Sequence, residues 1–99
     1  LMRVNLQGAN LTSASLQDAN LSRVDLQKAK LSSANLSGAN LSGANLRGVD
    51  LRGTDLRGVK NITVKQLAPA IIDMRTRLPE GITSKQIQKY KSGEISESL

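Results

Sequence analysis

Three arginines stand five residues apart near the middle of the chain: Arg47, Arg52 and Arg57. A guanidinium carries N–H donors in a fixed plane and binds carboxylates and phosphates, so an array of this kind could dock an acidic partner. The chain has no histidine and no cysteine. Imidazole bases, thiol nucleophiles, thiolate metal sites and disulfides are therefore excluded, and the arginines indicate binding chemistry.

The other polar residues form no catalytic motif. The eight acidic residues are scattered, without the cluster that a metal ion or an acid–base pair requires. The serines lack a histidine partner, and the glycines recur every five residues without the lysine of a phosphate-binding loop. We therefore expect no enzyme activity, no metal and no cofactor.

Composition limits the fold and the partners. The 99 residues carry 14 basic and 8 acidic side chains, a net charge of +6, and Tyr90 is the single aromatic residue. Residues 1–60 contribute eight basic and four acidic residues, a net of +4. An ordinary globular core is not expected from so few aromatics. No apolar run approaches the ~20 residues of a membrane span, so we expect no membrane segment and favour a cytoplasmic location.

The elements that position the arginines follow a leucine ladder with a period of five. Five helical steps of about 100° would place successive leucines about 140° apart, so they would not share a helix face. On a continuous strand, odd spacing would send them alternately to opposite faces. Leucine stands at positions 1, 6, 11, 16, 21, 26, 31, 36, 41, 46, 51 and 56.

Residues around each leucine suggest three extended residues and a corner. A small residue stands two positions before the leucine and a polar residue stands between them, as in Ala39-Asn40-Leu41. Glycine is frequent two positions after the leucine, where a type II turn requires positive φ. Such a unit buries its leucine only by stacking on copies of itself. We therefore expect the ladder leucines Leu6, Leu11, Leu16, Leu21, Leu26, Leu31, Leu36, Leu41, Leu46, Leu51 and Leu56 to form the core.

Segments such as Ala39-Asn40-Leu41-Ser42-Gly43 and Val49-Asp50-Leu51-Arg52-Gly53 resemble the pentapeptide-repeat family over about the first 60 residues. The resemblance implies an all-β fold, a right-handed quadrilateral β-helix (β-solenoid) with 20 residues to each square coil. Residues 1–60 would then make about three coils. Because the chain begins inside a repeat, an excerpt of a longer protein is one interpretation of the sequence, and the sequence leaves it open.

A 20-residue coil predicts which outward side chains become neighbours. Asn5, Asp25 and Asn45 would align, as would Asn10, Lys30 and Asp50. Lys30 and Asp50 would then form an exposed pair worth about 0.2–1 kcal/mol, or stay solvated independently.

The repeat ends at Lys60, and residues 61–99 are expected to form a helical and loop segment. Thr63 with Gln66, and Thr83 with Gln86, have the spacing of helix capping boxes, which predicts two short helices. The apolar residues Leu67, Ile71 and Met74 at helical spacing, with Ile72 and Leu78, would cover the open end of the coil, followed by a frayed tail at 94–99. A separate recognition segment is the alternative.

Function follows from the outer surface. Arg47, Arg52 and Arg57 would lie on three faces of one coil as a basic collar. They could pair locally with Asp50 and Asp55, dock an acidic protein or bind nucleic acid. We predict a non-enzymatic scaffold or protein–protein interaction module, with a polyanion binder as the alternative.

The net charge also bears on one role known in the family, the mimicry of DNA. Some pentapeptide-repeat proteins mimic the charge of DNA to bind type II topoisomerases, a mechanism that requires an acidic surface. The net charge of +6 disfavours that role. The expected partner is a protein of unknown identity, nucleic acid is disfavoured, and an end-to-end dimer is one option for the oligomeric state.

Overall fold

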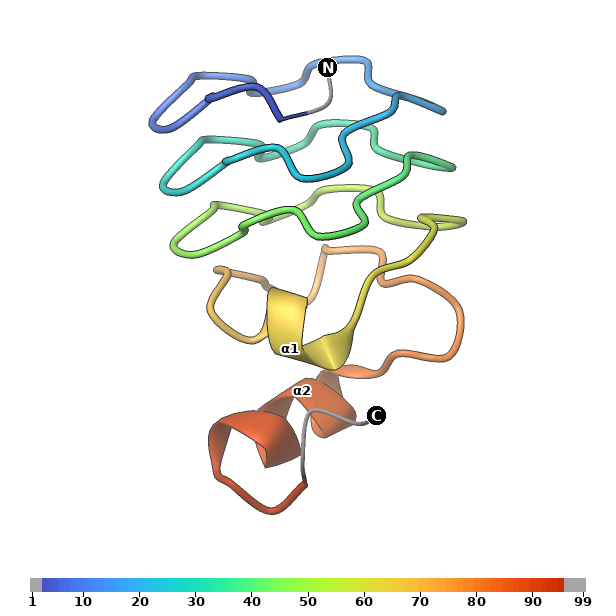
Figure 1. Ribbon diagram of the computed structural model, residues 1–99. Helices are drawn as coiled ribbons and strands as arrows, with labels where there is room; N and C mark the ends of the chain where they lie inside the picture. Colours follow the sequence, from blue (N-terminus) through green and yellow to red (C-terminus); the bar gives the residue numbers. More distant parts are fainter. Residues whose placement is uncertain (1–2, 96–99) are drawn as a thin grey trace.

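The computed structural model describes residues 3–95. The ladder position Leu1 and most of the predicted tail lie outside these residues. The chain winds through stacked turns and then reaches two helices, α1 (Val64–Leu67) and α2 (Ser84–Lys91), at the opposite end from residue 3 (Figure 1).

Parallel β-bridges join residues that are 20 positions apart. Asn5 pairs with Asp25 and Asp25 with Asn45, while Lys30 pairs with both Asn10 and Asp50. The predicted 20-residue alignment is therefore confirmed. Each bridge is a single residue, because a corner every five residues leaves only three extended ones. Within residues 3–95 the all-β expectation thus takes the form of isolated bridges and two helices, without longer strands.

Backbone amides hold neighbouring turns together. The Leu6 amide donates to the Asp25 carbonyl oxygen at 2.8 Å, and the Gly8 amide donates to that of Gln27 at 2.9 Å. In the other direction, the Asp25 amide donates to Val4 at 3.0 Å. The same three donors recur in residues 25–38, so three amides of every five in these repeats bind a neighbouring turn.

A fourth amide closes each corner. The Ala9 amide donates to the Leu6 carbonyl oxygen at 3.0 Å, and the equivalent bond recurs after the other leucines. The second residue after each leucine has positive φ, for example +69° at Gly48 and +61° at Lys28. Positive φ at that residue alone is the type II geometry, so the turn prediction is confirmed.

The ladder leucines point into the solenoid. Those from position 21 to position 56 are at most 2% exposed, whereas Leu6, Leu11 and Leu16 are partly buried and pack against that core. Thr54 takes an inward position that alanine or valine holds elsewhere. Its buried hydroxyl donates to the Leu31 carbonyl oxygen at 2.7 Å, which satisfies the hydroxyl within the core.

Helix α1 packs on the last repeats. The Thr63 hydroxyl accepts from the Gln66 amide, and the Gln66 side chain accepts from the Thr63 amide, as the capping box predicts. The Gln66 Nε2 also donates to the Leu41 and Ala44 carbonyl oxygens at 2.8 and 3.1 Å. Leu67 is fully buried, so both residues connect the helix to the solenoid.

Helix α2 contacts α1 and has the same cap 20 residues further on, with Thr83 and Gln86 in the box. Gly93 has φ +82° and follows the helix as its C′ residue. The Gly93 and Glu94 amides donate to Tyr90 and Lys89, the two bonds of a Schellman motif. Both predicted helices are confirmed, and Gly93 ends the second one.

The predicted apolar cluster is wrong at two positions. Ile71 is 48% exposed and Met74 is 97% exposed. Helix α1 ends at Leu67, and beyond Pro69 the chain is extended and Ile71 pairs with Asp50. Helical spacing therefore does not apply, and the Ile71 side chain points outward like the other bridge residues.

Ladder pairing continues beyond Lys60. Ile71 pairs with Asp50, and Arg77 pairs with Asp55, again in parallel. The Thr76 hydroxyl donates to the Leu51 carbonyl oxygen at 2.8 Å. Residues that lack the five-residue pattern thus extend the edge of the solenoid.

Leu36→Lys should unfold the solenoid, because Leu36 is 0% exposed and the substitution places a charge in the core. We expect a loss of at least about 4 kcal/mol in the free energy of unfolding, measured by urea denaturation. Leu6→Lys, at a partly buried ladder position, should cost far less. Equal losses for both variants would contradict the description of the core.

Gln66→Ala should lower the free energy of unfolding by about 1–3 kcal/mol, because the Leu41 and Ala44 carbonyl oxygens each lose a hydrogen bond. Gln86→Ala is the matched control, since Gln86 has the same capping role but, within residues 3–95, no hydrogen bond to a repeat carbonyl. Equal thermal unfolding shifts for the two variants would show that the Gln66 bonds to the repeats contribute nothing.

Candidate interaction surface

Outward asparagine and aspartate side chains hold the corners in place. The Ser37 amide donates to the Asn35 Oδ1 at 2.9 Å, and the Arg52 amide donates to the Asp50 Oδ1 at 3.1 Å. The same bond forms from the side chains at positions 5, 10, 20, 25, 40, 45 and 55. The sequence analysis assigned these residues only an outward position. Their preference for asparagine and aspartate, which form such turns, was the signal for this role.

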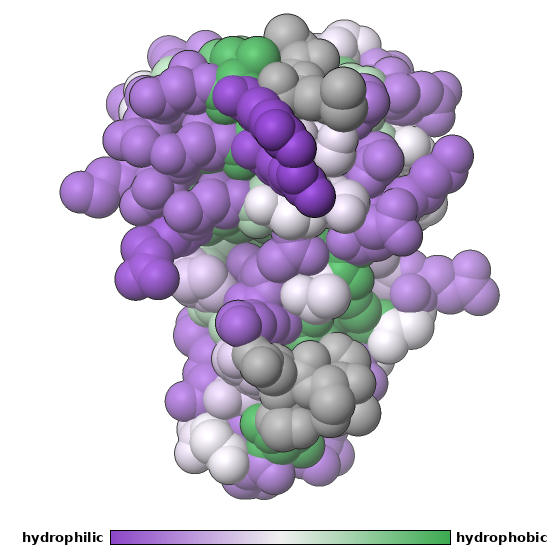
Figure 2. All heavy atoms as spheres, viewed as in Figure 1, coloured by the Kyte–Doolittle hydropathy of each residue, from purple (hydrophilic) through white to green (hydrophobic). Residues whose placement is uncertain are grey.

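Side-chain bonds of this kind complete the backbone hydrogen bonding of a repeat. In residues 34–38 all five amides donate: four to backbone carbonyl oxygens and one to the Asn35 side chain. Each outer side chain therefore starts from a fixed backbone. Figure 2 shows that hydrophilic residues cover most of the visible face of the solenoid.

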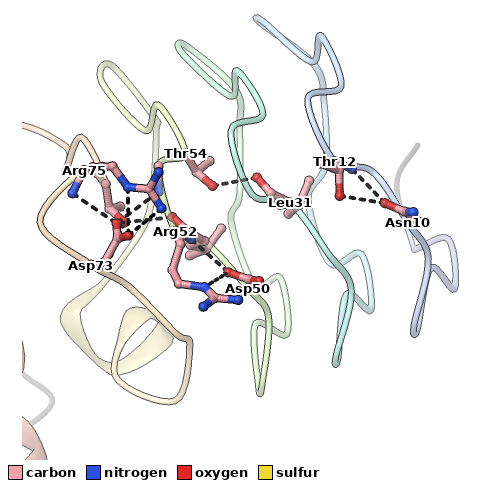
Figure 3. Close-up of polar contacts among 11 residues, drawn as sticks. Asn10, Thr12, Leu31, Asp50, Arg52, Thr54, Asp73 and Arg75 are labelled. Carbon is pink, nitrogen blue, oxygen red and sulfur yellow. Dashed lines mark hydrogen bonds and ion pairs between the residues drawn. The ribbon is translucent and has the colours of Figure 1, made fainter.

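Two of the three candidate arginines pair within their own repeat. The Arg52 Nη2 lies 2.7 Å from the Asp50 Oδ2, and the Arg57 Nη2 lies 2.8 Å from the Asp55 Oδ2. In both pairs the Nε donates to the other carboxylate oxygen, at 2.9 and 3.0 Å (Figure 3 shows Arg52). The local pairing that the sequence left as one alternative is therefore present for these two.

The hydrogen bonds from Arg52, opposed by partial burial, lower the pKa of Asp50 to about 2. Arg57 lowers the pKa of Asp55 in the same way. Both carboxylates are only 17–19% exposed, whereas the guanidinium side chains are 53–62% exposed. The outer halves of these arginines thus remain accessible while their charge is largely balanced.

A third pair of the same type lies outside the repeats. The Asp73 Oδ2 accepts from the Arg75 Nη2 at 3.0 Å, and the Asp73 Oδ1 accepts from the Gly53 amide at 3.1 Å. Asp73 and Arg75 stand beside Arg52 (Figure 3). The sequence analysis missed this pair, although Asp73-Met74-Arg75 has the Asp-x-Arg spacing of Asp50-Leu51-Arg52.

Arg47 differs from the other two arginines. Its repeat has Asn45 where theirs have aspartate, and Arg47 has no ion pair within residues 3–95. It lines a shallow depression of about 280 Å³ between the last repeats and α1, together with Gln66 and Pro69. The three arginines lie at three successive corners, so the structure does not bring them together.

Lys30 aligns with Asp50, but the described chain shows no ion pair between them. The Asp50 carboxylate is instead bound by Arg52 from its own repeat. Asp50 pairs with Arg52 and not with Lys30, because the Asp50 side chain already faces the Arg52 amide.

Acidic side chains do not gather into a candidate metal site in the part of the chain that the structure describes. Residues 3–95 contain no cluster of three or more aspartate or glutamate side chains suited to a metal ion. Within the same residues, no helix has the length and apolar character needed to cross a membrane.

Comparisons with known proteins agree on one family. The family model described as pentapeptide repeats (8 copies) matches the sequence at residues 1–38 and 25–60. A pentapeptide repeat protein from Nostoc Pcc 7120 (alr5209) is 32% identical with a TM-score of 0.59, covering 86% of this chain and 78% of that chain. No curated protein matches the chain.

Two further solved structures extend the range of the likeness. A pentapeptide repeat protein from the cyanobacterium Cyanothece 51142 is 34% identical, with a TM-score of 0.40 over 79% of this chain and 59% of that chain. The plasmid-mediated fluoroquinolone resistance protein QnrB1 is 17% identical, with a TM-score of 0.52 over 93% of this chain and 45% of that chain. At that identity the likeness to QnrB1 concerns the fold alone. Pentapeptide repeat proteins form right-handed quadrilateral β-helices.

Acid should weaken the fold through Asp50. Because its pKa is about 2 in the folded protein and ordinarily 3.8, its contribution to stability is present above about pH 4 and lost as the pH falls toward 2. Arg52→Gln should raise the pKa of Asp50 toward the ordinary value, whereas Arg57→Gln should leave it unchanged. Carboxyl ¹³C NMR titration measures both. An Asp50 pKa that ignores the loss of Arg52 would contradict the pairing.

Proposed function

The chain belongs to the pentapeptide-repeat family, and on that basis we propose that it is a non-enzymatic scaffold that binds other proteins. In this proposal residues 1–60 form a right-handed quadrilateral β-helix of about three coils, and residues 61–99 cap one end. The ladder leucines are its core and the outer corner residues are its recognition surface.

One observation supports the scaffold proposal above the others. The backbone amides of a repeat such as 34–38 are all satisfied within the protein, and the leucines at positions 21–56 are buried. The outer side chains therefore stand at fixed spacings on a rigid support. A partner that binds such a surface loses little entropy to ordering it.

A polyanion binder is the second candidate, supported by the net charge of +6 and by Arg47. However, the Arg52 and Arg57 charges are balanced by Asp50 and Asp55, which leaves Arg47 alone of the three without an ion pair in residues 3–95. A protein that tracks nucleic acid through a basic groove usually adds stacking aromatics, and Tyr90 is the only aromatic here. Mimicry of DNA is not supported, because residues 1–60 are net positive.

The two candidates differ in what an immobilised protein retains from a nuclease-treated extract. We expect specific polypeptides to be retained after nuclease treatment. We also expect a Kd for random-sequence duplex DNA that is weaker than about 10⁻⁴ M at low salt, measured by fluorescence anisotropy across a salt series.

Arg47→Gln is the diagnostic variant and Arg57→Gln its control. If the protein binds duplex DNA tightly, loses that binding in Arg47→Gln and retains no polypeptide from the extract, the polyanion binder would replace the scaffold as the favoured function. Protein retention that survives both substitutions would assign recognition to other outer positions.

A further inference from the structure

The segment 70–72 forms hydrogen bonds on one side only. The Ile71 amide donates to Val49 at 2.8 Å, and the Leu51 amide donates to the Ile71 carbonyl oxygen at 2.7 Å. On the other side, the Ala70 carbonyl and the Ile72 amide have no hydrogen-bond partner within residues 3–95.

These two free groups occupy the places that pair elsewhere in the solenoid. Ala70 and Ile72 flank Ile71 as Val49 and Leu51 flank Asp50, and Val49 and Leu51 both bind the next turn. In a continuing solenoid another strand would lie along residues 70–72. The edge therefore presents one donor and one acceptor in the register of a parallel bridge.

A groove lies where that strand is missing. It has a volume of about 520 Å³ and runs between residues 70–74 and helix α2. Ser84, Gln88 and Lys91 line its helical wall, at positions that share one helix face. Ile87, 2% exposed, anchors the same wall to the core. The opening is thus bounded by a strand edge and a fixed helix.

Apolar side chains flank the groove. Ile71 and Met74, both in its lining, are the only exposed large hydrophobic residues in the described chain. Their exposure is concentrated at one edge, in a solenoid whose other outer positions are polar or charged. Methionine adapts its shape to different apolar partners, which suits it to contact with a ligand side chain.

The charge of the groove is positive at one end. Lys91 has no ion pair within residues 3–95, and the last turn of α2 carries Lys89 and Lys91 without an acidic residue in the helix. The Asp73 carboxylate is already bound by Arg75 and by the Gly53 amide. The groove therefore suits a ligand that brings a carboxylate to Lys91.

We propose that this groove binds an extended segment of a partner protein, which adds one strand to the edge at residues 70–72. One residue of the segment donates its amide to the Ala70 carbonyl and accepts from the Ile72 amide. An apolar side chain packs on Ile71 and Met74, and an acidic one faces Lys91. Strand addition to an exposed edge is a known mode of peptide recognition. The inference rests on the proposed scaffold function and assigns it a binding site.

The position of helix α2 favours a peptide segment over a second copy of the chain as the ligand of the groove. A segment that is free on both sides can enter between the edge and the helix. The same edge of a second copy carries its own α2, which would meet the first helix before the two edges paired. A peptide segment therefore fits the groove better than a second copy does.

Random octapeptides displayed on phage and selected on the full 99-residue chain supply the probe, and the strongest binder is synthesised. We expect selected peptides to alternate apolar and polar residues and to contain an acidic residue. Amide hydrogen exchange followed by NMR should show new protection at Ile72 when the peptide is added. The amide of Asn10, which has no hydrogen-bond partner among residues 3–95 and lies at the far end of the solenoid, should stay unchanged.

Lys91→Glu should weaken binding of the acidic peptide roughly fivefold. Lys89→Glu is the matched control, because it makes the same charge change on α2 outside the groove lining. Proline at the bridging residue of the peptide should abolish Ile72 protection, since proline has no amide donor.

Several results would overturn the groove proposal. If Lys91→Glu and Lys89→Glu weaken peptide binding equally, or if the selection enriches no peptide, the groove is not the binding site. Ile72 protection that rises with protein concentration in the absence of peptide would assign the edge to a second copy. Peptide protection confined to residues 21–60 would reject the groove but keep the scaffold function, whereas retention of no protein in the extract experiment would reject the scaffold function itself.

Discussion

Hydrogen bonds between successive turns are the interaction on which the rest of this structure depends. A five-residue repeat is too short to bury its own leucine or to satisfy its own amides, so each repeat relies on the turn before it and the turn after it. In a repeat such as 34–38, three of the five amides cross between turns, one closes the corner, and the fifth is held by an asparagine side chain. The polar residue beside each leucine is therefore as much a part of the architecture as the leucine.

The last turn of such a solenoid has no following turn to pair with, so its backbone groups need other partners. At the C-terminal side the end is built from several unlike pieces: the Gln66 side chain binds two repeat carbonyls, Ile71 and Arg77 extend the pairing, and α2 packs against α1. This termination is incomplete at residues 70–72, where the Ala70 carbonyl and the Ile72 amide have no hydrogen-bond partner within residues 3–95 and lie beside the groove. An unpaired strand edge is a site where a further strand can add, which is the basis of the proposed peptide binding.

Charge is distributed by the same geometry. An arginine two residues after an aspartate meets that carboxylate, because both side chains project from one corner. Arg52, Arg57 and Arg75 are bound in this way, so the net charge of +6 overstates how much free positive charge the arginines present. Recognition through this surface consequently favours shape, polar contacts and isolated cations such as Arg47 over a continuous electrostatic field.

Sequence alone determined the stacked coil, the type II corners and both capped helices, because each follows from local spacing: leucine every five residues, glycine at the corners and threonine three residues before glutamine. The 20-residue register came from the resemblance to the pentapeptide-repeat family. Tertiary structure decided the rest. The exposed positions of Ile71 and Met74, the pairing of Asp50 with Arg52 in place of Lys30, and the role of Asp73 depend on where the chain travels after Pro69. The groove beside α2 exists because no strand follows along residues 70–72 and α2 forms the opposite wall of the opening, and no periodicity in the sequence records that change.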